Sequence, residues 1–184
     1  MPESILVISA SANGSTPDTG RALGNELRRA GYPVEIMELK DVDSLEGCTA
    51  IILGIPLYTV FSGNNGLGMF RQRFGEELAN IPVAVFGAGL FYEGLKPEKE
   101  EYVKTALKKI LSPIQPVAIT LFVSTLGREN LHTTDPDESP GIHPVADYPE
   151  PDKIRDWAAT LPLLLGLRQA DSPLCDASTH TVGI

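Results

Sequence analysis

The chain has 184 residues, 42% of them apolar and 21% charged, so it can form one domain with a packed core, and general disorder is excluded. A formal net charge of −9 disfavours nucleic acid and anionic lipid as partners. Cys48 and Cys175 lie far apart, which disfavours a disulfide scaffold or a cysteine-rich zinc site. The sequence contains no basic leader and no apolar run of membrane length, so we expect a cytoplasmic protein without an integral membrane segment.

The first half of the chain alternates strand and helix patterns. A continuously apolar strand at residues 4–9 is followed by a helix at residues 17–30. Strands at residues 33–38 and 49–54 come next, and the connection between them has room for only a helical turn or two. A second helix is predicted by the spacing of Leu67, Phe70, Phe74 and Leu78.

The second half continues this alternation and then loses it. A strand at residues 82–87 precedes a helix that begins at Pro97, with a predicted buried stripe of Tyr102, Ala106, Leu107, Ile110 and Leu111. After a fifth strand at residues 116–122, residues 123–150 read as a long acidic, proline-rich loop. The last helix opens at Pro151 and is expected to kink or end at Pro162.

These elements predict an α/β fold with three layers: a doubly wound, five-stranded parallel sheet in the order 2-1-3-4-5. The near-continuous apolar character of the strands is typical of a sheet covered by helices on both faces. We expect one domain over residues 1–166 and a poorly ordered tail over residues 167–184.

A loop of small polar residues after the first strand is the strongest chemical signal. Its backbone N–H groups can converge beside a helix N-terminus and cradle a phosphate. Thr16 is predicted as the N-cap, with Pro17 as the first helical residue. Because the loop has no lysine or arginine, it would hold phosphate through hydrogen bonds and the helix dipole. The alternative is an ordinary turn before a capped helix.

The ends of the third and fourth strands are expected to rise beside this loop. In a sheet of this order, ligands bind where the strand order reverses. Residues 54–59 and 87–92 contain glycines and the aromatic residues Tyr58, Phe91 and Tyr92, which could enclose a flat ring. The sequence therefore predicts a flat, phosphorylated cofactor at this rim.

Competing sites lack their defining residues. The sequence has no Walker lysine and no Gly-x-Gly-x-x-Gly fingerprint, and Gly54 stands where a receiver domain needs an aspartate. No histidine has a partner at metal-ligand spacing, so no metal site is predicted. Arg71 and Arg73 are predicted to face solvent, and Trp157 to lie in the core.

The loop Ser11–Thr16 resembles the Ser/Thr-x-Thr-Gly-x-Thr phosphate signature of the flavodoxin-like FMN-binding family, with Asn13 at a usual threonine position. The resemblance implies that this loop holds the phosphate of FMN and that the two rim segments flank its ring, with Tyr58 stacking on it. The implied cofactor-binding residues are Ser9, Ser11, Ala12, Asn13, Gly14, Ser15, Thr16, Pro56, Leu57, Tyr58, Thr59, Gly87, Ala88, Gly89, Leu90, Phe91 and Tyr92.

Within that family, residues 41–45, 54–58 and 154–158 resemble the flavodoxin-domain branch that includes menaquinone-dependent protoporphyrinogen dehydrogenase. The Pro56-x-Tyr58 motif also resembles NAD(P)H-dependent FMN reductases, whose phosphate loop usually carries an arginine that is missing here. The implied function is an FMN-dependent oxidoreductase that passes electrons or hydride to a small organic or quinone acceptor. Three alternatives stay open: an electron carrier that docks to a protein partner, an NAD(P)H-dependent FMN or quinone reductase, and a scaffold without flavin.

Overall fold

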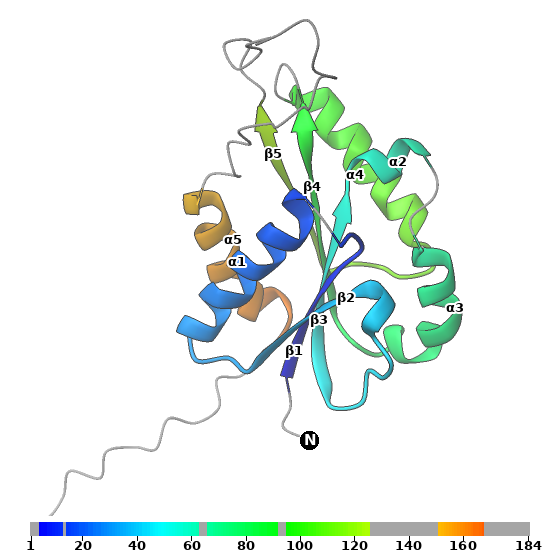
Figure 1. Cartoon of the computed structure of the whole chain (residues 1–184), viewed down its shortest axis with the longest axis vertical. Helices are drawn as coiled ribbons and strands as arrows, with labels where there is room; N and C mark the ends of the chain where they lie inside the picture. Colours follow the sequence, from blue (N-terminus) through cyan, green and yellow to red (C-terminus); the bar gives the residue numbers. More distant parts are fainter. Residues whose placement is uncertain (1–3, 13, 63–65, 92–94, 126–150, 168–184) are drawn as a thin grey trace, which may run out of the picture.

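Five parallel strands form a single sheet at the centre of the protein (Figure 1). The structure is a computed structural model and describes residues 4–12, 14–62, 66–91, 95–125 and 151–167. The strands are β1 (Ser4–Ser9), β2 (Val34–Glu38), β3 (Cys48–Pro56), β4 (Val83–Phe91) and β5 (Ala118–Thr125). Their order is β2-β1-β3-β4-β5, which confirms the predicted fold class.

Helices cover both faces of the sheet and make the two outer layers (Figure 1). One face is covered by α1 (Ser15–Arg29) and α5 (Pro151–Leu164), and the other by α2 (Tyr58–Ser62), α3 (Leu67–Leu78) and α4 (Pro97–Leu111). A single 3-10 turn, η1 (Leu39–Asp41), follows β2, as the short connection predicted. Every residue of β1 is buried, as expected for an inner strand between two helix layers.

Aromatic packing joins the sheet to α5. The Trp157 ring lies with its centroid 6.4 Å from that of Phe86 and 5.7 Å from that of Phe122, in edge-to-face geometry. This confirms the core position predicted for Trp157. Close to these rings, Gly54 of β3 leaves room for Phe86, because a Cβ at residue 54 would lie 2.3 Å from the Phe86 ring.

Three strands run further than predicted. β3 and β4 end at Pro56 and Phe91, because their parallel pairing continues beyond Gly54 and Gly87. β5 ends at Thr125, so residues 123–125 belong to the sheet and not to the predicted loop. Pro56 is paired with Ala88, and Phe91 with Thr125. The predicted rim segments therefore begin inside the sheet.

Two predicted details of the helices were wrong, and of the two outcomes predicted at Pro162, a kink or an end, the end did not occur. α1 begins at Ser15 with Gly14 as its N-cap, so Thr16 is a buried residue of the first turn and not the cap. In α4 the inward position is taken by Val103, and Tyr102 is 63% exposed. α5 continues past Pro162 to Leu164, because the backbone bond from Leu165 N to Leu161 O, 2.8 Å, maintains the last turn. Apart from Leu167, the predicted tail lies outside the described residues, as do residues 126–150 of the predicted loop.

Candidate functional site

The loop after β1 forms a cradle at the carboxyl edge of the sheet. Its first turn is anchored on β3 by a hydrogen bond of 2.8 Å from Ala10 N to Gly54 O. Gly14 has φ +88° and ψ −162°, a conformation that is essentially restricted to glycine. Among the described residues, the N-cap Gly14 makes no side-chain capping bond, and the first N–H groups of α1 are directed to the loop. These groups and the helix dipole favour an anion at this point.

A buried hydroxyl lies at the base of the cradle. Ser9 is 2% exposed, and within the described part of the chain its Oγ has no hydrogen-bond partner. Helix α1 approaches closely at Gly20, where a Cβ would lie 3.0 Å from Ser9 Oγ. Leaving a buried hydroxyl unsatisfied costs about 1–3 kcal/mol, so a partner for Ser9 Oγ, such as a bound ligand or an ordered water, would stabilise the protein.

A cavity of about 720 Å³ opens from this cradle. It begins at residues 9–12, passes Tyr58 and Thr59 of α2, and continues between η1 and α3. The Thr59 hydroxyl donates to Pro56 O at 2.7 Å and holds the first turn of α2, while Tyr58 is 66% exposed. The volume lies within the range of about 300–1,000 Å³ that is usual for small-molecule sites.

The structure brings together only part of the predicted site. The predicted residues that line the cavity are Ser9, Ser11, Ala12, Tyr58 and Thr59. Gly14, Ser15 and Thr16 form the N-cap and first turn of α1 at the cradle. Asn13 and Tyr92 lie outside the described residues, as do the side chains of Leu90 and Phe91.

The rim segment of β4 is covered by a core side chain. Leu57 is 1% exposed and packs over Gly87 and Gly89. A Cβ at residue 87 would lie 2.5 Å from Leu57 Cδ2, and a Cβ at residue 89 would lie 3.0 Å from Leu57 Cβ. Ala88 and Pro56 are buried as well. At residues 56, 57 and 87–89 a ligand can therefore contact only backbone atoms, and only where the strands end.

One wall of the cavity was missed by sequence reasoning. It is formed by α3 and the segment around η1, through Leu39, Val42, Met69, Phe70 and Phe74. The spacing of the two phenylalanines predicted only a core stripe. The available signal was Met69, a large apolar residue outside that stripe, which is 80% exposed.

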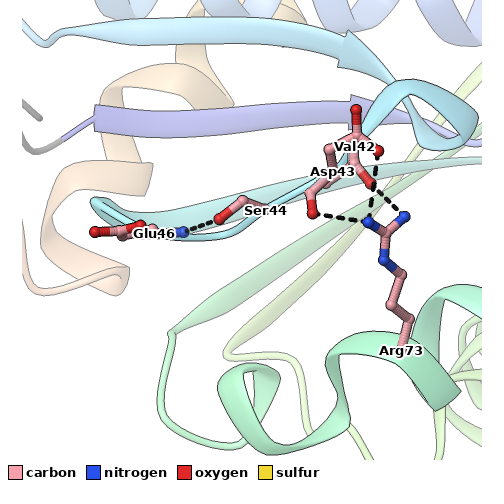
Figure 2. A network of polar contacts seen from close by, with 5 residues as sticks. All are labelled: Val42, Asp43, Ser44, Glu46 and Arg73. Atoms are coloured by element: carbon pink, nitrogen blue, oxygen red, sulfur yellow. Dashed lines mark hydrogen bonds and ion pairs between the residues drawn. The ribbon is translucent and has the colours of Figure 1, made fainter.

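Arg73 connects the two sides of this wall (Figure 2). Its Nη1 donates to Val42 O at 3.3 Å, and its Nη2 donates to Asp43 O at 2.9 Å and approaches Asp43 Oδ1 at 3.5 Å. Its guanidinium carbon also lies 4.9 Å from the centroid of the Phe74 ring. Arg73 is exposed, as predicted, and its hydrogen bonds also tie the β2–β3 connection to α3.

Arg71 was predicted to face solvent too, but this prediction is wrong, because Arg71 is half-buried. Its Nη1 donates to Ile110 O at 2.8 Å and to Ser112 O, at the C-terminus of α4. Arg71 thus supplies donors for terminal carbonyls of that helix.

Near the cavity, the positive charge of Lys40 is already paired. Lys40 Nζ lies 2.8 Å from Glu38 Oε2, and this hydrogen bond and charge raise the pKa of Lys40 above its ordinary value. Among the described residues there is no group of histidine, cysteine or acidic side chains that could hold a metal ion. The arrangement can therefore bind an anion through backbone and hydroxyl donors, next to a largely apolar cavity.

Comparisons with known proteins agree with this geometry. Residues 6–136 match the family model of the flavodoxin domain. No curated protein sequence is significantly similar to the chain. None of the helices in the described ranges has the length and apolar character needed to cross a membrane.

Solved structures similar to this fold include three flavodoxins. A cysteine-to-serine mutant of the flavodoxin from Pseudomonas aeruginosa has a TM-score of 0.53 and 17% identity, over 89% of this chain and 99% of that one. A short-chain flavodoxin associated with a bacterial microcompartment has a TM-score of 0.51 and 11% identity, over 88% and 97%. The two-electron reduced flavodoxin of Megasphaera elsdenii has a TM-score of 0.50 and 18% identity, over 85% and 98%.

Proposed function

The chain belongs to the flavodoxin-domain family, and from that premise we propose that it is an FMN-dependent redox protein whose phosphate site is the loop from Ser9 to Thr16. When bound, FMN supplies a ring that accepts and donates one or two electrons. The protein's own residues hold the phosphate, orient the ring and control what reaches it.

The observation that carries this proposal is the orphaned Ser9 hydroxyl beneath an uncapped helix N-terminus. Within the described part of the chain Ser9 Oγ has no hydrogen-bond partner and the N-cap Gly14 makes no side-chain capping bond, and a phosphate oxygen accepts hydrogen bonds from both O–H and N–H donors. Residues 9–16 contain no cation, and the whole chain carries a net charge of −9. Phosphate binding therefore depends on oriented N–H and O–H groups.

The ring is proposed to lie against Tyr58, at the ends of β3 and β4. Tyr58 is exposed beside the cavity and belongs to the same lining as the cradle, so it can stack on a flat ring without any change in the core. Backbone groups of residues 56–59 and 87–92 would contact the edge of the ring. Because Leu57 fills the space over Gly87 and Gly89, the ring is restricted to the outer ends of these strands.

We favour an oxidoreductase with a small organic or quinone acceptor, because the cavity extends beyond the cradle and Tyr58. The likeness to the protoporphyrinogen dehydrogenase branch is part of this proposal, as is a cytoplasmic location. A carrier that docks to a protein partner is the second candidate, and the net charge of −9 favours it, since an acidic surface suits a basic partner. Steady-state turnover of a soluble quinone with reduced nicotinamide as the electron donor, and without a second protein, distinguishes the first from the second.

Titration of the protein with FMN, followed by quenching of flavin fluorescence, tests the proposal. Ser9→Ala should weaken FMN binding about tenfold, the loss of roughly one hydrogen bond to a charged group. The same change should leave the FMN-free protein equally stable or more stable, because it removes an unsatisfied buried hydroxyl. Ser4→Ala, at the opposite end of β1, is the control and should leave FMN affinity unchanged.

Absence of FMN binding by the natural sequence would overturn the proposal. If FMN binds and Ser9→Ala has the same affinity, the cofactor does not contact this hydroxyl, and the phosphate site is elsewhere.

A further inference from the structure

The cavity continues beyond the cradle into a groove between η1 and α3. We define this η1–α3 groove by Leu39, Val42, Met69, Phe70, Arg73 and Phe74. It lies on the β2 side of β1, since η1 directly follows β2, whereas the FMN ring is proposed to lie on the β3 and β4 side. FMN in its proposed position would therefore not fill the groove.

The floor of the groove is aromatic. Phe70 and Phe74 are 5% and 4% exposed, and their ring centroids lie 5.1 Å apart at an interplanar angle of 55°. Val42, at 2% exposure, completes the floor from the opposite side. Most of each ring is packed in the core, and the parts that reach the cavity offer contacts to a third ring.

The rim combines a soft apolar side chain with hydrogen-bond donors. The Met69 thioether is exposed on α3, and sulfur contacts favourably with aromatic rings. On the same helix, Gln72 and Arg73 add amide and guanidinium groups to the lining. An oxygen on the edge of a ring-shaped ligand would find donors here.

Arg73 also holds the groove at a defined width. Its contacts with Val42 O and Asp43 O join residues some 30 positions apart in the sequence and fix the η1 segment relative to α3 (Figure 2). A groove braced in this way is formed before a ligand arrives, which is typical of small-molecule sites.

We propose that the η1–α3 groove is a second binding site, next to the FMN site, for a flat aromatic molecule that carries a hydrogen-bonding oxygen. The aromatic floor and the thioether select the ring, and Gln72 and Arg73 select the oxygen. The site is separate from the phosphate cradle and does not require FMN to be bound.

The test uses the full chain with its three methionines labelled with ¹³C at the methyl group. The probe is 2-naphthol, and 1-decanol is the comparison, since it has the same number of carbons and one hydroxyl but no ring. We expect 2-naphthol to shift the Met69 methyl resonance, assigned with Met69→Leu, in a saturable manner. Met37 in β2 does not line the cavity and should not shift. The same titration is made with and without saturating FMN, and both should show binding.

A filling variant gives a second readout. Met69→Trp should weaken 2-naphthol binding at least tenfold in titration calorimetry and leave FMN affinity within twofold. Leu163→Trp, at an 88% exposed position of α5 on the opposite layer, is the matched control and should change neither.

Each contrary result overturns a defined part of the inference. No shift of Met69 shows that there is no such site. Equal binding of 1-decanol shows an alkyl-chain site, and competition between FMN and 2-naphthol shows that the groove belongs to the FMN site. If FMN does not bind while 2-naphthol does, the proposed function fails and the second site stands.

Discussion

A single charge at the start of α1 should separate folding from cofactor binding. Ser15 follows Gly14 and is the first residue of the helix, half-buried at the cradle. Ser15→Asp adds a carboxylate to the first turn, where Asp18 already lies, and interaction with the helix dipole should stabilise the fold by about 0.3–1 kcal/mol. The same carboxylate would repel a bound phosphate.

The expected loss of affinity follows from the position of Ser15. Two like charges about 4 Å apart repel by about 1 kcal/mol in water and about 4 kcal/mol near a protein surface. For a half-buried position we take about 2 kcal/mol, which corresponds to roughly 30-fold weaker FMN binding. Ser15→Asn is the matched control, since it has the same shape without the charge.

The assay combines FMN fluorescence quenching with urea unfolding of the FMN-free protein. Ser15→Asp should unfold at an equal or higher urea concentration than Ser15→Asn and bind FMN about 30-fold more weakly. Equal FMN affinity of these two folded variants would refute the reasoning, because the phosphate could not then lie at the start of α1.

Four further changes test the packing and chemistry around the site. Gly54→Ala should destabilise the protein by about 1–3 kcal/mol in urea unfolding, because the new Cβ would lie 2.3 Å from the fully buried Phe86 ring. An unchanged midpoint of urea unfolding would show that the ring can move. Gly75→Ala, where a Cβ meets nothing within 4 Å, should instead stabilise α3 by about 0.5–1 kcal/mol, and a loss of stability would contradict this. Arg71→Ala should lower the free energy of unfolding by about 1–3 kcal/mol, because the C-terminal carbonyls of α4 lose their donors. Arg71→Lys should restore only part of this loss, and full restoration would indicate that charge alone matters. Burial raises the pKa of the Cys48 thiol, so less of the reactive thiolate is present at pH 8. In a variant whose other cysteine is replaced by serine, the folded protein should therefore react with a disulfide reagent at least tenfold more slowly than the unfolded protein. Equal rates would show that Cys48 is accessible.

Local patterns were sufficient to predict the layers of the fold. The apolar strands and the helical spacings each reflect burial of a continuous face, which depends on neighbouring residues in the chain. The strand ends were less predictable. Glycine usually interrupts a strand, but Gly87 and Gly89 lie inside β4. A side chain at either position would collide with Leu57, so glycine is required there. This contact joins residues 30 positions apart, and no local rule reveals it.

The candidate site also has one part that the sequence predicts and one part that it does not. The cradle was predictable because loop, glycine and helix start are contiguous in sequence, although Gly14 and not Thr16 is the N-cap. The η1–α3 groove was not predictable, since a phenylalanine at a core spacing has the same pattern whether or not a cavity lies above it. Arg73 was missed because its partners are carbonyl groups of a distant turn.

The central claim is that this acidic chain holds the phosphate of FMN through oriented N–H and O–H groups. Comparing FMN with riboflavin, which has the same ring without the phosphate, tests it most directly. The account predicts that the protein binds FMN at least 100-fold more tightly than riboflavin, about 2.7 kcal/mol. Equal affinity for the two flavins would contradict it.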